Sequence, residues 1–458
     1  MLMIATLHMT RIMLCVIQND IKINSMNIFK NRWMQLSLSV AVLVIISGPQ
    51  YLWALFVRPL LIKFDVPLSE LQVVFSLVVV CMTFITPLAG YFHDRFNSKA
   101  IIGLGLLMCS GSWVLASQAD SLLALYLSYG VMGGLGAGIA FIGVTGLVQK
   151  CFPDRRGLAT GILMSGYAFG PLLTTYSVSQ SVDSSGVDIT LNEFGVLFML
   201  ASLIVVSGIR APKNINIPAL SNATTASNVD AGADTSAMLK TGVFWLMFFM
   251  MTMIAASGMM VTSNIAIIAK ESGIGSEIIM FGMAALPLAL MVDRIANGFS
   301  RILFGSISDK LGRENTLALA FFLEAIFVLL WFSQLHNPVM FIVLSGLVFL
   351  AWGEIFSIFP ALCTDTFGER NASVNFGFLY ASVGIGAIFG GPVAALLREM
   401  TGSWSLVFYM VIMLDVVTAI LAISLLKKMR SKYKESCDEP SVDSQGSAGL
   451  AQATNLAN

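Results

Sequence analysis

Apolar residues fall in runs of about 20 that recur along the whole chain, with short polar segments between them. An α-helix of about 20 residues is long enough to cross the hydrocarbon core of a bilayer. The pattern predicts helices over residues 35–57, 71–91, 100–118, 121–148, 158–181, 191–209, 241–269, 279–304, 315–335, 339–363, 374–397 and 403–426. The predicted fold is therefore an all-α membrane protein with twelve transmembrane helices.

The composition supports a membrane protein. Of 458 residues, 57% are hydrophobic and 11% are charged, whereas about a quarter of the residues of a soluble domain are charged. A soluble fold would have to bury all the apolar runs in one core, with little polar surface left to cover it. The net charge of +0 and the lack of a basic patch argue against nucleic-acid binding.

Two polar loops of the chain have matching sequences. GYFHDRFNSK begins at Gly90 and GSISDKLGRE begins at Gly305. The separation between Asp94 and Asp309 equals the separation between these two glycines. Each loop follows the second helix of a predicted set of six, which indicates two pseudo-symmetric six-helix halves. Internal repeats of this kind are typical of secondary transporters, in which one half moves against the other.

Polar segments mark the expected domain boundaries. The expected parts are an N-terminal cytoplasmic segment (1–32), a six-helix half (33–209), a central cytoplasmic loop (210–240), a second six-helix half (241–428) and a disordered cytoplasmic tail (429–458). The first residues lack the basic start and the cleavage site of a signal peptide. Either Met1 or Met26 can be the start of translation, and we favour Met26.

Lys and Arg are distributed unevenly between the predicted loops. If both termini face the cytoplasm, the outward-facing segments contain only Arg58, Lys63, Lys270 and Arg398 of the 26 basic residues. Basic residues concentrate on the cytoplasmic side of membrane proteins. We therefore expect both termini in the cytoplasm and the protein in the plasma (inner) membrane.

The charged groups of the two matching loops are candidates for a gate. An Asp at a helix end, with Arg or Lys a few residues later, can hold neighbouring helices by charge-assisted hydrogen bonds in one state and release them in another. The alternative is a plain basic loop on the cytoplasmic side. The predicted gating residues are Gly90, Asp94, Arg95, Gly305, Asp309, Lys310 and Arg313.

The loop pattern G-x-x-x-D-R/K-x-G-R resembles the signature of the major facilitator superfamily. The second loop carries the whole pattern, whereas the first has Asn97 and Ser98 where Gly and Arg are usual. Longer stretches are similar to the oxalate:formate antiporter family: NRWMQLSLSVAVLVIISGPQYLW from Asn31, FPDRRGLATG from Phe152, NGFSRILFGSISDKLGR from Asn297 and AWGEIFSIFPALCTDTFG from Ala351. The resemblance covers nearly all of residues 31–430, and it implies an antiporter of small organic anions.

Charged residues deep in the predicted helices are candidates for function. In this sequence they occur in the second half, at Asp293, Arg294, Arg301, Glu324 and Glu354. A charge at the bilayer centre costs on the order of 3 kcal/mol or more, which favours a functional role. Arg294 and Arg301 are seven residues apart, so they share a helix face about 10 Å apart. Asp293 and Arg294 form either a structural pair or part of a proton path, and Glu324 is expected to contact a neighbouring helix.

The family resemblance implies a role for Arg301, which matches the arginine that holds a substrate carboxylate in that family. A guanidinium fits a carboxylate because two parallel N–H groups meet its two oxygens. The alternative is a packing residue bonded to backbone carbonyls. The other pocket positions that the resemblance implies are Gln50, Tyr51, Phe141, Trp352, Phe356, Tyr380 and Val383.

Three of these pocket positions depart from the family pattern. Phe141 and Phe356 stand where tyrosines are usual, and Val383 stands where a lysine grips the second carboxylate of oxalate. A dianion beside Val383 would leave one carboxylate unpaired in an apolar site, which is costly. Monocarboxylates such as formate, pyruvate or lactate are therefore the expected substrates.

Glu354 suggests an alternative to exchange. Burial between Trp352 and Phe356 favours the neutral acid unless a cation is close. If Arg301 or Arg294 lies opposite, Glu354 can pair with it in the empty state and take up a proton when substrate occupies the arginine. Proton-coupled monocarboxylate symport is thus the alternative mechanism, and a structural ion pair is the alternative role.

Other chemistries have little support in the sequence. There is no C-x-x-C pair, the three His are scattered, and there is no G-x-x-x-x-G-K-S/T phosphate loop. We therefore expect no metal, no cofactor, no ATP and no enzymatic activity. The expected partners are a small carboxylate anion and the lipid bilayer, with the protein as a monomer. A carboxylate sensor and a passive channel remain as other classes of function.

Overall fold

The computed structural model describes residues 30–89, 98–152, 156–210, 234–274, 278–280, 283–368 and 371–438. The N-terminal half contains α2 (Arg32–Ile46), α3 (Gly48–Tyr51), α4 (Trp53–Phe64), α5 (Leu68–Phe84), α7 (Ser98–Ser117), α8 (Leu122–Leu125), the π-helical η1 (Tyr126–Met132), α9 (Gly133–Cys151), α10 (Arg156–Phe169), the 3₁₀ turn η2 (Gly170–Leu173), α11 (Thr175–Ser185) and α12 (Val187–Gly208). The C-terminal half contains α13 (Thr235–Met238), α14 (Gly242–Glu271), β1 (Ile278–Met280), β2 (Met283–Ala284), α15 (Ala285–Leu311), α16 (Arg313–Ser333), α17 (Pro338–Trp352), α18 (Ile355–Phe367), α19 (Ala372–Ile388), η4 (Phe389–Val393), α20 (Ala394–Thr401), α21 (Ser405–Leu421), η5 (Ala422–Leu426) and α22 (Lys427–Asp438).

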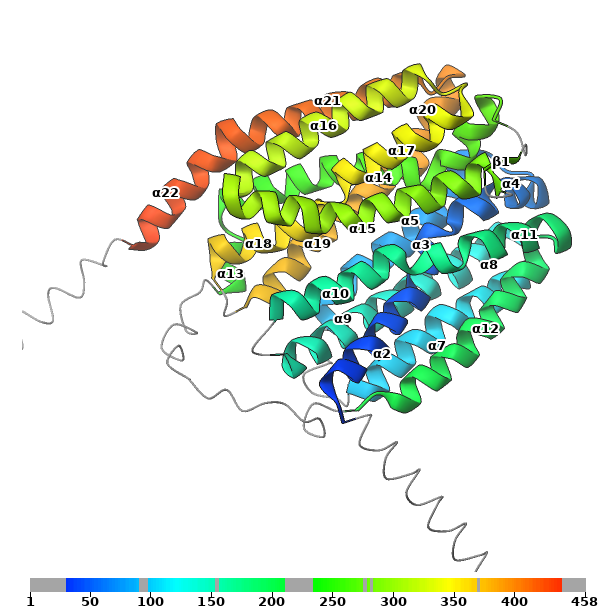
Figure 1. Ribbon diagram of the computed structural model, residues 1–458, viewed down its shortest axis with the longest axis horizontal. Helices are drawn as coiled ribbons and strands as arrows, with labels where there is room; N and C mark the ends of the chain where they lie inside the picture. The colour runs from blue at the N-terminus through cyan, green and yellow to red at the C-terminus, as the bar shows by residue number, and fades with distance from the viewer. Residues whose placement is uncertain are drawn as a thin grey trace, which may run out of the picture.

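The helices form two groups that lie side by side, α2 to α12 in one and α14 to α21 in the other (Figure 1). In the part of the chain that the structure describes, 10 helical segments are long and apolar enough to cross a membrane. The α10–η2–α11 run and α15 complete the predicted twelve. Their apolar character is lower because α11 is rich in Ser and α15 carries buried charges. The arrangement agrees with the predicted twelve-helix membrane fold.

Several predicted helices are interrupted near their middles. Pro49 lies in the short α3, Pro171 lies in the 3₁₀ turn between α10 and α11, and Gly353 lies between α17 and α18. Proline has no N–H for the helical ladder, and glycine adds backbone freedom, so such residues mark helix breaks. The predictions of continuous helices over residues 35–57, 158–181 and 339–363 are therefore corrected.

The eighth transmembrane helix begins later than predicted. Strands β1 and β2 pair antiparallel just before it, and α15 starts at Ala285 instead of residue 279. The helix then runs without a break to Leu311, well beyond the predicted end at residue 304. This single long helix carries Arg294 and Arg301.

Small residues bring helices α7 and α9 into close contact. A Cβ atom at Gly105 would lie 2.6 Å from the backbone nitrogen of Ala140, and one at Gly136 would lie 2.4 Å from that of Cys109. Close backbone approach through small residues stabilises helix pairs in lipid, where no hydrophobic effect drives them together. These helices therefore form a tightly packed part of the N-terminal half.

Hydrogen bonds connect the two halves through α5. The Gln72 side chain donates to the carbonyl oxygen of Ser263 on α14 (2.8 Å), and Glu399 on α20 accepts from the backbone and hydroxyl of Ser69 (2.8 and 2.7 Å). Ser69 lies at the start of α5, directly after α4 ends. These contacts therefore lie at the end of the bundle opposite the start of α2 and the end of α22 (Figure 1).

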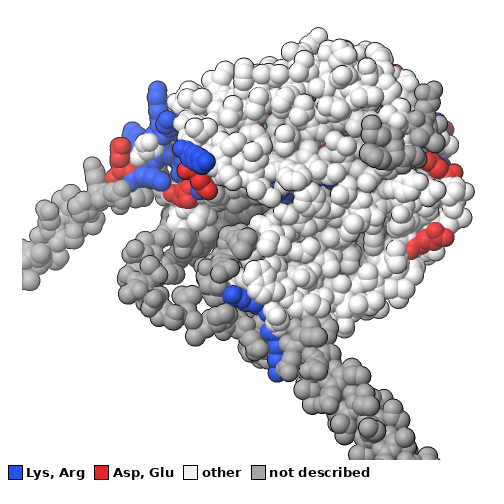
Figure 2. Space-filling model, viewed as in Figure 1, with Lys and Arg blue, Asp and Glu red and all other residues white. Residues whose placement is uncertain are grey.

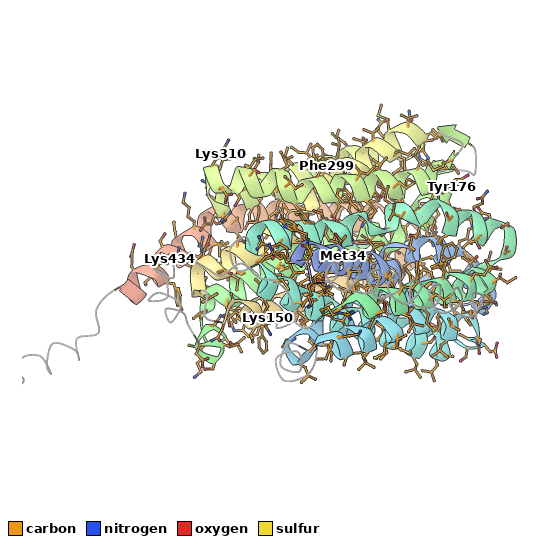
Figure 3. All side chains as sticks on the ribbon, turned by 60° about the horizontal axis from the view of Figure 1, so that its bottom comes forward. Met34, Lys150, Tyr176, Phe299, Lys310 and Lys434 are labelled. Atoms are coloured by element: carbon orange, nitrogen blue, oxygen red, sulfur yellow. The ribbon has the colours of Figure 1, made fainter. Side chains whose placement is uncertain are left out.

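Charged side chains gather at the ends of the bundle. In the face shown in Figure 2, Lys, Arg, Asp and Glu gather near α22, mainly Asp and Glu appear at the opposite end, and the band between them is largely uncharged. Lys310 and Lys434 lie toward one end and Tyr176 toward the other, while Phe299 lies between them and is 58% exposed (Figure 3). An uncharged band with exposed apolar side chains is the surface that lipid requires.

Candidate functional site

Arg301 of α15 lies where the two halves meet. Its Nη1 donates to the backbone carbonyl of Met164 on α10 (2.9 Å), and its Nη2 donates to Asn297 Oδ1 (3.3 Å). The guanidinium carbon lies 4.9 Å from the centre of the Phe356 ring, and the Nε–H has no hydrogen-bond partner. The side chain is 9% exposed. The carbonyl contact was the packing alternative, yet one N–H group of this buried cation is still free.

Arg294 lies two turns earlier on the same helix and is 2% exposed. Its guanidinium carbon lies 4.1 Å from the ring centre of Tyr51 in the N-terminal half and 4.3 Å from that of Phe349 on α17. The Nε and Nη1 groups have no hydrogen-bond partner. Aromatic faces stabilise a cation electrostatically, but they accept no conventional hydrogen bond. Arg294 therefore keeps free donors in a buried place.

Aromatic rings from both halves form a continuous chain of contacts between the two arginines. Starting from the ring beside Arg294, Tyr51 contacts Tyr167 (5.5 Å between ring centres), which contacts Phe141 (6.1 Å). Phe141 stacks on Tyr380 of α19 at 6.0 Å, and Tyr380 contacts Phe356 beside Arg301 at 6.3 Å. The structure thus brings together four of the predicted pocket residues and adds Tyr167.

A second row of rings joins the same arginines along α17 and α18. Phe349 contacts Trp352 (5.6 Å) and Trp352 contacts Phe356 (5.4 Å). The Trp352 Nε1 donates to the backbone carbonyl of Ile254 on α14 (2.9 Å). A Cβ atom at Gly258 would lie 2.1 Å from the Trp352 ring. The ring is therefore fixed against α14, so Trp352 supplies an apolar surface with no free N–H group.

Polar side chains are few among these rings. The Tyr167 hydroxyl donates to Gln50 Oε1 (2.7 Å), while the Gln50 amide nitrogen lies 3.7 Å from the sulfur of Met259. Sulfur is a weak acceptor, so this amide remains available for a better one. Val383 is buried and offers no polar group. Tyr167 could not be predicted from the sequence, because an aromatic residue in an apolar run looks like any packing residue.

The neighbour of Arg294 is the buried Asp293. Its carboxylate is 0% exposed, attracts the charge of Arg294, and approaches Ser345 of α17. The two side chains do not form a contact ion pair, because neither carboxylate oxygen has a hydrogen-bond partner. Asp293 is therefore a close acidic neighbour of Arg294 that does not occupy its donors.

Glu354 lies in a different environment from the one expected. Its carboxylate oxygens have no hydrogen-bond partner among the described residues, and the charge that acts on it is that of Glu324. Neither Arg294 nor Arg301 is among its interacting charges, so this structure does not contain the expected pair, and a pairing in another state stays a prediction. The backbone direction at this point accounts for the different environment. Gly353 faces α15, where an added Cβ atom would lie 2.7 Å from the carbonyl oxygen of Asn297. The next residue, Glu354, therefore faces another side of the helix.

A cluster of buried carboxyl groups, which we call the carboxyl cluster, consists of Glu324, Glu354 and Asp415. The Ser257 hydroxyl of α14 donates to Glu324 Oε1 (2.6 Å) and lies 3.5 Å from Asp415 Oδ2. All three acids are 0% exposed. Asp415 was not among the predicted residues, although it is a lone acid in the apolar run VIMLDVVTAI, the same signal that identified the others. Glu324 contacts a neighbouring helix, α14, as expected.

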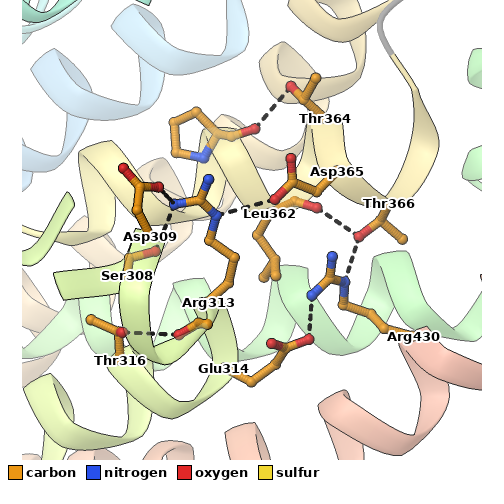
Figure 4. Close-up of polar contacts among 12 residues, drawn as sticks. Ser308, Asp309, Arg313, Glu314, Thr316, Leu362, Thr364, Asp365, Thr366 and Arg430 are labelled. Carbon is orange, nitrogen blue, oxygen red and sulfur yellow. Dashed lines mark hydrogen bonds and ion pairs between the residues drawn. The ribbon is translucent and has the colours of Figure 1, made fainter. Parts of the chain in front are cut away.

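The second polar loop holds three helices together (Figure 4). Arg313 at the start of α16 donates to Ser308 Oγ (2.7 Å) and Asp309 Oδ1 (2.8 Å) on α15 and to Asp365 Oδ2 (3.1 Å) on α18. Such shared contacts fit the expected clamp, while its release in another state stays a prediction. Lys310 is exposed and makes no ion pair with a described residue.

The remaining predicted gating residues contribute less. A Cβ atom at Gly305 would meet nothing within 4 Å, so close packing does not require this glycine. Glu314 and Arg430 form a further ion pair beside the Arg313 contacts, and Arg430 also donates to Thr366 (2.7 Å). The positions of the first loop, Gly90, Asp94 and Arg95, lie outside the described residues.

The described residues contain no group of three or more His, Cys, Asp or Glu that could hold a metal ion. The carboxyl cluster is therefore not a metal site as it stands. What the buried site between the halves offers is two guanidinium groups with free donors, enclosed by aromatic rings. Such a site can bind a small anion by charge and hydrogen bonds, and it can exclude water.

Comparisons with known proteins agree with this chemistry. The model of the Major Facilitator Superfamily matches residues 38–379 and 247–448. The oxalate:formate antiporter of Oxalobacter formigenes is 27% identical over 413 residues, which cover 90% of this chain and 95% of that protein. Monocarboxylate transporter 12 of Mus musculus is 39% identical over 97 residues, which cover 21% of this chain and 20% of that protein.

One solved structure shares the fold. It is a bacterial homologue of the human lysosomal transporter Spinster, crystallised in an inward-facing and unoccupied conformation. The TM-score is 0.64 at 14% sequence identity, and the match covers 88% of this chain and 98% of that chain. At this identity the likeness supports the fold alone.

Proposed function

This chain belongs to the major facilitator superfamily, and we propose that it moves small carboxylate anions across the membrane by alternating access, as an anion exchanger. It is a multi-pass membrane transporter and not an enzyme, as the sequence predicted. The observation that carries the proposal is the buried Arg301, which joins α15 of one half to α10 of the other and keeps a free Nε–H.

Arg301 suits a carboxylate for two reasons. A guanidinium presents parallel N–H groups that match the two carboxylate oxygens, and the surrounding rings strengthen the attraction by excluding water. Its present partners, the Met164 carbonyl and the Asn297 side chain, are neutral oxygens. An incoming carboxylate would provide stronger, charge-assisted bonds in their place.

The surroundings of Arg301 favour monocarboxylates. Arg301 has a free donor for one carboxylate, whereas the second carboxylate of oxalate would meet the uncharged Val383. Formate, pyruvate and lactate avoid this cost, and we propose that oxalate is a poor substrate.

The contacts between the halves support alternating access. Gln72 and Ser69 of α5 bind α14 and α20 at one end of the bundle, and Arg301 binds α10 at the site itself. Breaking the first set while the site reorganises would open the opposite side, as in transporters whose halves rock around a central site. We place both termini in the cytoplasm, the protein in the plasma membrane, and the working unit as a monomer.

Counterflow in proteoliposomes tests the function. Vesicles loaded with unlabelled pyruvate should accumulate labelled pyruvate, formate or lactate from the medium, and oxalate should compete weakly. A passive channel gives no counterflow, and a carboxylate sensor gives no flux. Absence of flux with every monocarboxylate, from correctly folded protein, would refute the proposal.

The carboxyl cluster favours a second candidate, proton-coupled symport. Carboxyl groups buried without a contacting cation are held most readily in the protonated form, and they can exchange protons when the helices move. In that case an inward proton gradient would drive net uptake into empty vesicles. Exchange alone predicts no uptake without an internal anion, so the two mechanisms separate in one experiment.

A further inference from the structure

Arg294 has buried hydrogen-bond donors that the proposed transport cycle does not yet use. We propose that Arg294 is a second substrate-contacting residue, which donates a hydrogen bond to a 2-oxo or 2-hydroxy oxygen while Arg301 binds the carboxylate. This inference rests on the proposed carboxylate transport. It makes Arg294 the residue that separates 2-oxo and 2-hydroxy acids from simple fatty acids.

The first argument comes from its hydrogen bonding. The side chain is 2% exposed, and its Nε and Nη1 have no partner among the described residues. Tyr51 and Phe349 contact the faces of the guanidinium, with their ring centres 4.1 and 4.3 Å from its carbon. Face contacts leave the donors at the guanidinium edge unused, and buried donors without partners are costly. A ligand oxygen would remove that cost.

The second argument comes from charge. Asp293 attracts Arg294 but does not hydrogen-bond it, so the N–H groups of Arg294 remain available. A neutral acceptor such as a ketone or hydroxyl oxygen can use these donors without bringing a further charge into the buried site.

The third argument comes from spacing. Arg294 and Arg301 are about 10 Å apart along α15, and each guanidinium lies against its own ring, Phe349 or Phe356. The charges of the two guanidinium groups act on one another, so both border the same buried site. A 2-oxo acid brings two neighbouring acceptors to such a site, its carboxylate and its ketone oxygen. Formate lacks the second acceptor, so it would contact only one arginine.

The test compares pyruvate with propionate, which has the same number of carbons and lacks the ketone oxygen. Both are measured as competitors of labelled pyruvate uptake by the purified, reconstituted full chain. Wild-type protein should prefer pyruvate by about tenfold or more, the effect of one hydrogen bond to a charged donor. In Arg294→Gln this preference should fall to about twofold, with the larger loss on pyruvate.

Two further variants keep the test decisive. Arg294→Lys retains a charge and a donor and should keep part of the preference. Asp293→Asn with Arg294→Gln removes both charges together, so it remains informative if the single variant fails to fold. An unchanged pyruvate-to-propionate ratio in Arg294→Gln, or no preference in wild type, would overturn the role of Arg294 while leaving carboxylate transport standing. Lack of uptake of either acid by wild type would instead contradict the proposed function.

Discussion

Two buried charged regions of the C-terminal half have opposite sign and different surroundings. Arg294 and Arg301 lie against aromatic rings and backbone of both halves. Glu324 and Asp415 are buried beside Ser257, Glu354 interacts with Glu324, and all these partners belong to the same half. An arginine cannot give up its proton, so its buried charge needs a partner. A carboxyl group can become neutral by binding a proton. We therefore expect the arginines to bind the anion, whereas the acids need no ligand.

The two regions are nevertheless neighbours through one helix break. Gly353 packs against Asn297, which accepts a hydrogen bond from Arg301, and the next residue is Glu354 of the carboxyl cluster. A movement of Arg301 toward substrate could therefore reach the acids through the backbone of this break. Variants on each side show whether the regions act independently.

The largest effect is expected from Arg301→Lys. Lysine keeps the charge but loses the fork of parallel donors, and a hydrogen bond to a charged group contributes about 1.5–3 kcal/mol. We expect monocarboxylate uptake to fall by about tenfold to a hundredfold in proteoliposomes.

Arg398→Lys is the matched control for this substitution. Arg398 pairs with Glu271 at 2.6 Å near the bundle end, and both side chains are about a third exposed. Surface pairs contribute little, so uptake should stay close to wild type. Near-normal uptake by Arg301→Lys, at normal protein levels, would remove this arginine from substrate binding.

The sequence predicted five of the buried charges, missed Asp415, and did not predict the surroundings of Glu354. Arg294 and Arg301 stand out because a charge in an apolar run costs free energy. Both lie on one continuous helix, so its periodicity places them on a shared face. The partner of Glu354 could not be derived in this way, because the helix breaks at Gly353 and the periodicity of a continuous helix no longer gives the side-chain direction. The fold class is predicted from the long apolar runs, and a local error in side-chain direction does not change that prediction.

The next largest effect is expected from Gly258→Ala. The new methyl group would lie 2.1 Å from the ring of Trp352, which contacts both Phe349 beside Arg294 and Phe356 beside Arg301. Overpacking of this kind costs about 1–3 kcal/mol, so the unfolding temperature in detergent should fall by several degrees. Uptake should fall with it, because Trp352 also supports Phe356 beside Arg301.

Gly305→Ala is the control for that substitution. Gly305 also lies inside a helix, but its added methyl group would meet nothing within 4 Å. Alanine should therefore leave stability unchanged or raise it by about 0.5–1 kcal/mol, because it favours the helix. Equal losses in the two variants would show that the Trp352 contact is not the cause.

A smaller effect is expected from Ser257→Ala. The substitution removes the hydroxyl that donates to Glu324 at 2.6 Å and leaves that oxygen without a partner. The expected loss of stability is about 1 kcal/mol, measured by thermal unfolding. Ser306→Ala, whose exposed hydroxyl donates only to the backbone of its own helix, should have almost no effect. Exchange activity should remain in both variants if the carboxyl cluster does not bind the anion.

The smallest effect on exchange is expected from Glu354→Gln. A glutamine has the shape of a neutral glutamic acid, and the carboxylate of Glu354 has no cation as a partner in the structure. Exchange between loaded vesicles and medium should stay within about twofold of wild type. The same vesicles, emptied and given an inward proton gradient, report on the alternative mechanism.

If Glu354 carries a coupled proton, its amide variant loses the gradient-driven uptake and keeps exchange, because an amide cannot bind and release that proton. Symport would then replace exchange as the mechanism, and the break at Gly353 would connect substrate binding at Arg301 to protonation. Loss of both activities, with normal folding, would instead mean that Glu354 belongs to the anion site after all. In that case the acidic region would also take part in anion binding, and the two regions would not have separate roles.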